Sequence, residues 1–517
     1  MEQWDCVVVG AGSAGAAVAG RLSENLDVRV LVLEAGPDWE AVDCPPSLRN
    51  PVNMYKWDVT THDAVPPDYK WAGQDAVRIA GRVAAPYLRG KGLGGCSSVN
   101  GCYAIRPPVP EFNDWVTAGA TGWGPDDVLP YFSRLERDAE FGAEAYHGQD
   151  GPTPITRVSQ EDWGTIDEGL RDSALALGHP WWADHNAPGH EGVSLTASNI
   201  ENGLRVTTND SYLEPVRKRD NLRILGNARV DRVLLAGGRA IGVMATVDGE
   251  PLIVHADRVV LSAGALYTPA ILQRSGIGPA GLLRELGIDI VADLPVGVGL
   301  QDHAGFELLL RVPGARAARS GRRRGNCTIR HSSGLPGRGF GDLLLTDVNV
   351  APDGELGGLL CKLAQCFSRG SVQIVSADPD APPRVDFNLL DDPRDVVLAR
   401  FALRHAFELV RAGKYPKDTA FIDVEGREVD LDMPDAELDR WAASVIRDTA
   451  HAASGCAIGG PDDPAATLDT RCRVRGVPNL WVADTSALPT VPRANTHLPA
   501  IMVGERVADW VAETNAS

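Results

Sequence analysis

The chain has 517 residues, enough for about three domains at roughly 150 residues each. Apolar residues make up 44% and charged residues 23%, which is typical of a globular protein and excludes long disorder. Asp and Glu number 69 against 50 Lys and Arg, and the net charge of -19 disfavours nucleic acid and anionic membrane surfaces as partners.

Cysteine usage and hydropathy bear on location. The nine cysteines are an odd number, are scattered and form no CxxC pair, which is typical of free thiols in a reducing compartment. No uninterrupted apolar run reaches the length that a bilayer demands, and the first residues lack the basic and apolar regions of a signal peptide. We therefore expect a cytoplasmic protein with no membrane span.

The chain opens with a strand, a glycine turn, a helix and a second strand. Residues 6–9 are a continuous apolar run of the kind buried on both faces of a parallel sheet, residues 14–22 have helical spacing, and residues 28–34 form the next strand. We expect further strands at 222–225, 229–235, 258–262 and 480–484, strand-like alternation at 305–312 and 343–376, and helices at 393–412 and 500–512. Pieces of a nucleotide-binding domain thus occur near the N-terminus, near 220–300 and at the C-terminus, with a second, interleaved domain between them.

The glycine turn has the spacing of a dinucleotide-binding loop. Gly10, Gly12 and Gly15 form a GxGxxG between strand and helix: the first permits the tight turn, the second admits a pyrophosphate, and the third allows close helix packing. Glu34 ends the second strand about 20 residues later, where an acid accepts a hydrogen bond from a ribose hydroxyl. A carboxylate there disfavours NADP, while NAD and FAD both stay open. A glycine turn that only packs helix on strand is the other interpretation.

Four further sequence blocks accompany this motif. They are Arg89–Gly101 (RGKGLGGCSSVNG), Gly264–Pro279, Leu294–Gly297 with Leu300–His303, and Asn479–Ala508, which contains Val482-Ala483-Asp484 and Asn495-Thr496-His497. Together with the GxGxxG they extend over almost the whole chain, and on them the sequence resembles the glucose-methanol-choline (GMC) oxidoreductase family. The resemblance implies FAD as the dinucleotide.

The resemblance also implies an architecture. We expect an α/β protein in which a Rossmann-type FAD-binding domain is interleaved with an α+β substrate domain that contains an antiparallel sheet. The FAD-binding parts would be residues 1–155 (with a lid or excursion at 37–80), 216–304 and 446–517, and the substrate-domain parts 156–215 and 305–445. The last FAD-binding part would carry the catalytic histidines.

The predicted cofactor site combines the glycine motif with the family blocks. Gly94 and Gly95 would bring backbone N–H groups against the flavin, Asn100 would bond its polar edge, and Asp484 would meet the ribityl chain or, alternatively, cap a turn. The full predicted set is Gly10, Gly12, Ser13, Ala14, Gly15, Glu34, Ala35, Arg89, Gly94, Gly95, Ser98, Asn100, Gly101, Val230, Ala263, Gly264, Asp484, Thr496, His497 and Leu498. Some family members attach FAD covalently through a His in a Cys-Ser-Ser-His-Asn context. This chain has Val99 there, so we predict non-covalent FAD.

His451 and His497 are the predicted catalytic residues. Alcohol oxidation needs a base for the hydroxyl proton and a polar group that holds the oxygen, and a neutral imidazole is the natural base at neutral pH. Family members use a His in a His-x-x-Gly-Thr stretch and a second His or Asn in an Asn-Thr-(Asn/His)-like stretch. By motif position His451 would be the base and His497 the oxygen-binding partner, although Ser454-Gly455 stands where Gly-Thr is usual. Outside such a motif, a histidine is more often a surface or core residue.

The expected function is oxidation of a small-molecule alcohol to an aldehyde or ketone by hydride transfer to flavin N5, with O₂ or another acceptor reoxidising the flavin. Three alternatives stay open: a flavin-containing lyase like the hydroxynitrile lyases of this family, a dehydrogenase linked to the carrier mycofactocin, and a non-catalytic FAD-binding protein. The sequence holds no metal-binding motif. The basic segment 316–330 is either a solvated loop or a lid for an acidic substrate or acceptor.

Overall fold

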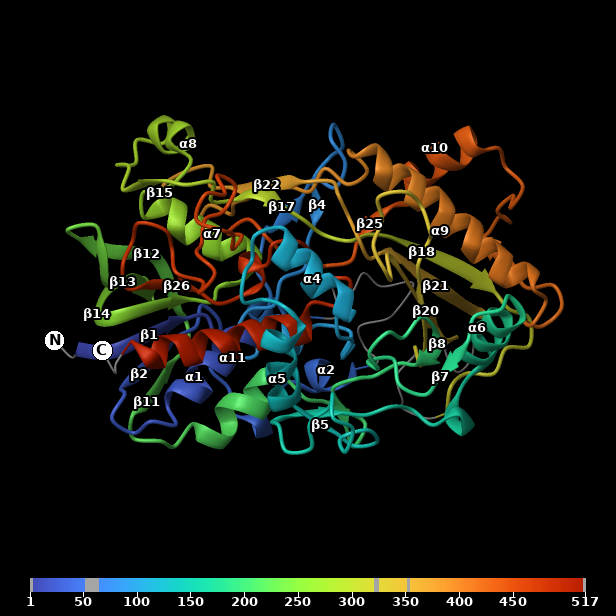
Figure 1. Ribbon diagram of the computed structural model, residues 1–517, viewed down its shortest axis with the longest axis horizontal. Coiled ribbons are helices and arrows are strands. Elements are labelled where there is room, and N and C mark those ends of the chain that lie inside the picture. Colours follow the sequence, from blue (N-terminus) through green and yellow to red (C-terminus); the bar gives the residue numbers. More distant parts are fainter. Residues whose placement is uncertain (1–2, 52–64, 320–324, 351–353, 515–517) are drawn as a thin grey trace.

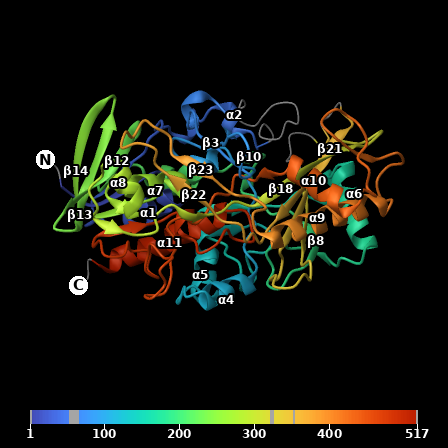
Figure 2. The same cartoon turned by 90° about the horizontal axis from the view of Figure 1, so that it is seen from above.

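The fold is built around two large sheets, one toward each end of an elongated molecule (Figure 1). It is seen in a computed structural model that describes residues 3–51, 65–319, 325–350 and 354–514. The predicted fold class, a Rossmann-type domain joined to a domain with an antiparallel sheet, is confirmed. Figure 2 places β12 (Ala228–Ala236), β13 (Arg239–Val247) and β14 (Glu250–Leu261) at one end and α9 (Pro393–Arg411) and α10 (Asp435–Val445) at the other.

The first sheet has seven strands in the order β11-β2-β1-β14-β13-β12, with β26 paired to β14. The remaining strands of this sheet are β1 (Gln3–Val9), β2 (Val30–Leu33), β11 (Leu222–Leu225) and β26 (Leu480–Val482). β1 runs parallel to β2 and β14, and β14 runs parallel to β26. Val7 and Val8 of β1 are fully buried, as their apolar run predicts.

β14 is longer than the strand predicted at 258–262. Its second part, from His255 to Leu261, pairs with β1, whereas its first part, from Glu250 to His255, pairs with the antiparallel β13. The first part is partly exposed, so it lacks the continuous apolar run by which the buried part was predicted.

Two helices that are distant in the sequence pack side by side (Figure 1): α1 (Ser13–Leu22) and α11 (His497–Glu513). Gly504 allows the approach, because a Cβ there would lie 2.4 Å from the carbonyl oxygen of Ala14. α11 begins at His497 rather than at residue 500. Its first turn contains Pro499, which the start of a helix tolerates because the missing N–H has no intrahelical acceptor there.

The second sheet has eight strands in the order β24-β18-β21-β20-β19-β8-β7, with β25 paired to β18. Its pairs are antiparallel except β7 with β8. The strands are β7 (Trp181–Trp182), β8 (Gly192–Leu195), β18 (Ala304–Arg311), β19 (Cys327–His331), β20 (Leu343–Val348), β21 (Leu356–Leu363), β24 (Ala420–Ile422) and β25 (Arg447–Asp448).

Side chains along this second sheet alternate between two faces. Phe306 and Cys361 belong to an apolar cluster that also contains Leu398 of α9, so their face is covered by helices. Glu307 and Lys362, one position further along β18 and β21, therefore point to the other face. All four residues are in the lining of the cavity described below. We call the face with Glu307 and Lys362 the inner face of the sheet.

Shorter elements complete the fold. They include α2 (Pro46–Arg49), α4 (Val109–Thr117), α5 (Pro125–Leu135), α6 (Thr165–Ala176), α7 (Gly264–Arg274), α8 (Ala280–Glu285), β5 (Glu136–Asp138), β6 (Thr153–Ile155), β17 (Val298–Leu300), β22 (Gly370–Gln373) and β23 (Arg384–Asp386). Among the described residues, no helix combines the length and apolar character needed to span a bilayer.

Two predicted segments fall partly outside the described residues: the excursion 37–80, of which 52–64 are not described, and the basic segment 316–330, of which 320–324 are not described. The ends of the basic segment are anchored to the protein. Arg316 pairs with Glu168 at 2.7 Å, and the buried Arg330 donates a hydrogen bond to the carbonyl oxygen of Arg106.

Candidate active site

A cavity of about 1180 Å³ lies between the glycine turn after β1 and the inner face of the second sheet. Most of the predicted cofactor and catalytic residues line it: Gly10, Gly12, Ser13, Ala14, Glu34, Ala35, Arg89, Gly95, Asn100, Gly101, Val230, Ala263, Gly264, His451, Asp484, Thr496 and His497. Gly15, Gly94, Ser98 and Leu498 are not in the lining. Gly15 and Gly94 pack against neighbouring protein atoms, Ser98 bonds the backbone, and Leu498 is buried in the core.

The glycine turn leaves room for a phosphate at the start of α1. Gly10 has φ +95°, and a Cβ on it would lie 2.5 Å from the carbonyl oxygen of Ser262. A Cβ on Gly12 would meet only the Cα of Gly95, at 3.9 Å, so this side of the turn is open. Gly12 is the N-cap of α1 and provides no capping side chain. The N–H groups and the positive end of the helix dipole are therefore available to an anion.

Glu34 holds the two glycine-rich loops together. Its carboxylate accepts hydrogen bonds from the backbone N–H groups of Ala11 at 2.8 Å, Gly36 at 2.9 Å and Gly92 at 2.9 Å. Burial raises the pKa of this carboxyl, and the three hydrogen bonds oppose that shift. Glu34 lines the cavity while making these bonds. The carboxylate thus holds the conformation of the two loops. The contact with a ribose hydroxyl, which the motif predicts, stays a prediction.

Asp484 fixes the backbone at the opposite wall. One carboxylate oxygen accepts from the N–H and hydroxyl of Ser486, and the other accepts from the N–H of Gly264 and the hydroxyl of Thr268. Burial raises the pKa of this carboxyl. Asp484 therefore caps a turn, which was the alternative interpretation of this residue. A contact between Asp484 and the ribityl chain stays a prediction.

His451 is held by neighbours on both sides of its ring. Nδ1 lies 2.8 Å from the Thr449 hydroxyl and 3.0 Å from Nδ1 of His303, while Nε2 lies 3.2 Å from Nδ2 of Asn495. The backbone N–H of His451 donates to Asp302 at 3.0 Å. These contacts fix the ring plane and leave Nε2 as the nitrogen beside Asn495.

The electrostatic surroundings of His451 favour its neutral form. Burial, then the charge of Lys362, then His303 and Arg89 lower the pKa of this imidazole well below its ordinary value. Burial, followed by the charge of Lys362, also lowers the pKa of His303 to about 3. The neighbouring pair is therefore neutral at physiological pH, and His451 is in the form that can accept a proton.

His497 lines the same cavity as His451, but its side-chain contact is with the glycine turn. It is the first residue of α11, and its Nδ1 lies 3.2 Å from the hydroxyl of Ser13 in the glycine turn. Sequence reasoning pairs His451 with His497, whereas the structure places the Asn495 amide against the His451 ring. Asn495 and His497 are two residues apart in the segment that enters α11, so their side chains diverge.

The residues present fit FAD. The open side of the glycine turn suits a pyrophosphate, and the segment at Val230 lines the same cavity. Nε2 of His497 and Oδ1 of Asn495 are buried polar atoms with no hydrogen-bond partner in the described structure. Buried polar groups are normally paired, so a polar ligand in the cavity would satisfy both. Val99 is buried and lines the cavity, and its side chain offers no nucleophile for a covalent link.

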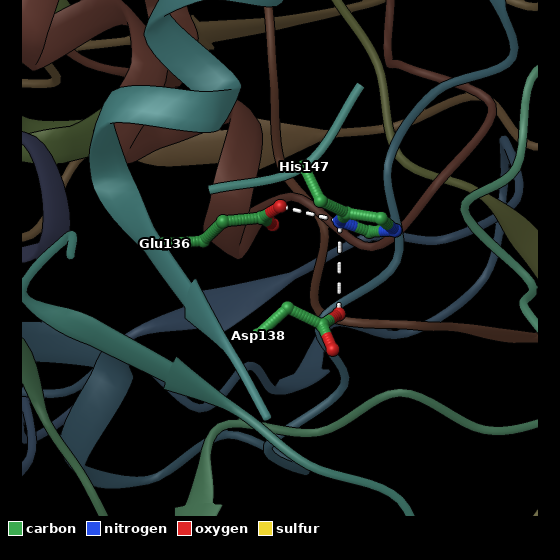
Figure 3. Close-up of side chains that lie close together, drawn as sticks. All are labelled: Glu136, Asp138 and His147. Atoms are coloured by element: carbon green, nitrogen blue, oxygen red, sulfur yellow. Dashed lines mark hydrogen bonds and ion pairs between the residues drawn. The ribbon is translucent and has the colours of Figure 1, made fainter. Parts of the chain in front are cut away.

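A second group of titratable side chains lies away from this cavity (Figure 3). Glu136, Asp138 and His147 are buried together and close enough to ligate one metal ion. Nδ1 of His147 lies 2.5 Å from Glu136 and 3.6 Å from Asp138. However, Arg106 pairs with Glu136, and Arg157 pairs with Asp138 at 2.9 Å. A divalent cation would have to compete with both guanidinium groups, so the arrangement is that of an ion-pair network.

Three residues that act on His451, two by contact and one by its charge, were missed by sequence reasoning. Asn495 and His303 lie in sequence blocks that resemble the family, but nothing in the sequence predicts that either contacts His451. Lys362 lies in a strand-like segment where apolar residues dominate. A lone lysine within such a strand is a signal that could have been used, because a charged side chain there must face solvent or a cavity.

Comparison with known proteins agrees with this site. Residues 4–305 match the N-terminal region and residues 366–504 the C-terminal region of the GMC oxidoreductases, as represented by family models. The chain is an FAD-dependent oxidoreductase. It belongs to the GMC oxidoreductase family, and the predicted family and cofactor are confirmed.

Three relatives illustrate the similarity. The chain is 35% identical to a 5-(hydroxymethyl)furfural oxidase of Methylovorus sp. (strain MP688), with 98% of each chain covered. It is 33% identical to an oxygen-dependent choline dehydrogenase of Vibrio vulnificus (strain YJ016), covering 99% of this chain and 94% of the relative. The crystal structure of pyridoxine 4-oxidase from Mesorbium loti superimposes with a TM-score of 0.87 at 28% identity, covering 99% of both chains.

Proposed function

We propose that this protein oxidises an alcohol to an aldehyde or ketone, with His451 as the base that removes the hydroxyl proton. The observation that carries the proposal is the contact between His451 and Asn495 in the cavity that also receives the glycine turn. Bound FAD supplies the hydride acceptor. The protein supplies the base and the oxygen-binding group.

His451 has the geometry and charge state of a general base. Thr449 and His303 hold Nδ1, so a substrate hydroxyl would have to bind at Nε2, beside the Asn495 amide that Nε2 contacts in this structure. A base that is positioned by its neighbours needs little reorganisation when the proton moves. Because burial and the Lys362 charge keep the ring neutral, this lone pair is available at physiological pH.

Asn495 is the group that would hold the substrate oxygen. Its Nδ2 lies 3.2 Å from Nε2 of His451, so a hydroxyl bound at Nε2 also lies within reach of the amide. An amide N–H donates to the oxygen as negative charge develops on it, which lowers the barrier of the step. In this proposal Asn495 takes the role that motif position suggests for His497, and the Ser13 contact of His497 assigns that side chain to the cofactor side of the cavity.

We further propose O₂ as the electron acceptor and the cytoplasm as the location. Two of the relatives named above are oxidases, and the third is called oxygen-dependent, which supports O₂. All nine cysteines are free thiols, which supports a reducing compartment. Val99 supports non-covalent FAD, as predicted from its place in the family block.

The test is anaerobic mixing of the purified holoprotein with a panel of alcohols while the flavin absorbance is followed. Bleaching by one class of alcohol, with an aldehyde or ketone formed in equal amount, is the expected result. Admission of air should then restore the absorbance within the turnover time if O₂ is the acceptor. A flavin that no alcohol bleaches would overturn the proposal and leave lyase chemistry as the function to test.

A further inference from the structure

Two ionisable side chains of the long strands of the second sheet line the cavity, Glu307 from β18 and Lys362 from β21, and Arg447 of the short strand β25 lines it beside Glu307. Neither belongs to the predicted cofactor site, and neither takes part in the proton transfer proposed above. Because this wall and His451 line the same cavity, the charges of the wall act on whatever alcohol binds there. The inference that follows rests on the proposed function and concerns the chemical class of the substrate.

Lys362 is the charge that lies deepest in this wall. The residue is only 5% exposed, and Nζ lies 4.9 Å from the centroid of the Tyr103 ring. Its strand neighbours are Gly305 and Leu344, and a Cβ on Gly305 would lie 2.8 Å from the Thr449 methyl group. Because Gly305 has no side chain, the paired strands β18 and β21 can come close to the segment that carries His451.

The positive charge of Lys362 influences the protonation of the histidines at the reaction centre. It acts on both His451 and His303, and among the charged groups it has the strongest influence on each of them. A positive field at the base opposes a cationic substrate and favours an anionic one. In a buried site this preference is strong, because little water is present to screen it.

Glu307 carries the opposite charge, but its side chain is more exposed to solvent than that of Lys362. Its side chain is 51% exposed, and its nearest cation is Arg447, 3.9 Å away. In the register of the sheet Glu307 faces Leu360, whereas Lys362 faces Gly305. Glu307 therefore stands further along the wall than Lys362, in a better-hydrated part of the cavity where its charge is more strongly screened.

We propose that Lys362 is a specificity-determining residue whose ammonium group binds an anionic substituent, a carboxylate in the simplest case, on the alcohol substrate. The substrate is then a hydroxy acid whose hydroxyl reaches His451 while its carboxylate reaches the inner face of the second sheet. A charge-assisted hydrogen bond in a buried site is stronger than a neutral one, so this contact would dominate discrimination among alcohols.

Binding can be tested without turnover. Benzoate and benzamide have nearly the same shape and differ in charge, and either one, bound in the cavity, would perturb the flavin absorbance spectrum. For the wild-type holoprotein we expect benzoate to bind at least tenfold more tightly than benzamide. Lys362→Met should abolish this difference, whereas Lys414→Met, at an exposed lysine after α9, should preserve it.

Turnover gives the second readout. Anaerobic flavin reduction is compared for 4-(hydroxymethyl)benzoate and 4-(hydroxymethyl)benzamide, with FAD content and thermal unfolding measured for each variant. Lys362→Met should lower kcat/KM for the benzoate at least tenfold more than for the benzamide. Glu307→Gln should change the ratio in the opposite direction, because it removes a negative charge from the same wall.

The outcomes separate the two proposals. If the benzamide reduces the flavin but the preference is the same in wild type and Lys362→Met, the Lys362 inference is overturned and the proposed function stands. If Lys362→Met loses FAD or unfolds, Lys362→Arg, which keeps the charge, must retain the preference for the carboxylate or the inference fails. If neither alcohol nor any other reduces the wild-type flavin, the proposed function fails and this inference fails with it.

Discussion

Nδ2 of Asn495 lies 3.2 Å from Nε2 of His451, and this contact joins the segment before α11 to the segment after β25. Both residues line the cavity that also receives the glycine turn. The pair therefore presents a proton acceptor and a hydrogen-bond donor to the same point in space. An acceptor and a donor are the two groups needed to remove a hydroxyl proton while stabilising the oxygen that loses it.

Replacing His451 by Ala should remove the base. We expect anaerobic flavin reduction by a good alcohol substrate to slow by about 10²–10⁴-fold, the usual contribution of a general base. His255→Ala, at a histidine on β14 that does not line the cavity, is the matched control and should reduce at the wild-type rate. An unchanged rate in His451→Ala, at full FAD content, would remove His451 from this role.

The assignments of Asn495 and His497 can be separated by two substitutions. Asn495→Ala should lower the reduction rate by about 10²–10³-fold, the effect of losing one donor to a developing oxyanion. His497→Ala should act mainly on cofactor affinity, because its imidazole contacts Ser13 in the glycine turn. The measurements are stopped-flow reduction and FAD titration of the apoprotein. The opposite pattern, with reduction lost in His497→Ala and retained in Asn495→Ala, would restore the pairing predicted from motif position.

The pH dependence of reduction should report the lowered pKa of His451. Burial and the Lys362 charge disfavour the imidazolium, so the neutral base persists below the ordinary histidine pKa and protonates only in more acidic solution. The rate should therefore stay constant from pH 8 to about 6.5, the unperturbed histidine pKa, and fall only below it. In Lys362→Met the acid limb should move to higher pH, because one charge that opposes protonation is gone. An acid limb at the same pH in both proteins would contradict this.

Glu34 should be needed for FAD binding as well as for holding the two glycine-rich loops together. Glu34→Gln keeps the shape of the side chain but replaces one accepting oxygen by a donor, which then opposes one of the three backbone N–H groups. We expect FAD affinity to fall at least tenfold, measured by fluorescence as free FAD is released on dilution. Gln3→Glu, at an exposed position on β1, should leave the affinity unchanged.

The Glu136–Asp138–His147 network makes a prediction about stability (Figure 3). Burial alone would lower the pKa of His147, but hydrogen bonds to Asp184 and Glu136 outweigh it and raise the pKa. Protonated His147 therefore stabilises the fold fully below the unfolded-state value of about 6.5, and this contribution is lost as pH rises through the raised pKa.

Substitution and chelation test this network separately. His147→Ala should lower the free energy of unfolding by about 3–5 kcal/mol at pH 6, the effect of breaking a buried ion pair, and by less at pH 9. Because Arg106 and Arg157 already pair with the carboxylates, EDTA should leave the unfolding temperature unchanged. A drop in unfolding temperature on chelation would show that a metal ion binds here.

The sequence by itself determined the features that are local. The strand, glycine turn, helix and acid of residues 6–34 form one continuous unit, so the spacing of Gly10, Gly12 and Glu34 predicts their joint position at one end of a parallel sheet. The family blocks likewise predict FAD and a base at His451, because each motif is read along the chain. The start of α11 was missed because Pro499 looks like a helix breaker unless it stands in the first turn.

Only the tertiary structure decided which side chains meet. His451 contacts Asn495, 44 residues away, and His303, 148 residues away. Along the chain, Asn495 and His497 are equally plausible partners for His451. The choice between them depends on the turn into α11, which points one side chain toward His451 and the other toward Ser13. Lys362 joins the site only because β21 lies beside β18 in a sheet whose inner face closes the cavity. Such contacts depend on packing between distant segments, which sequence spacing does not encode.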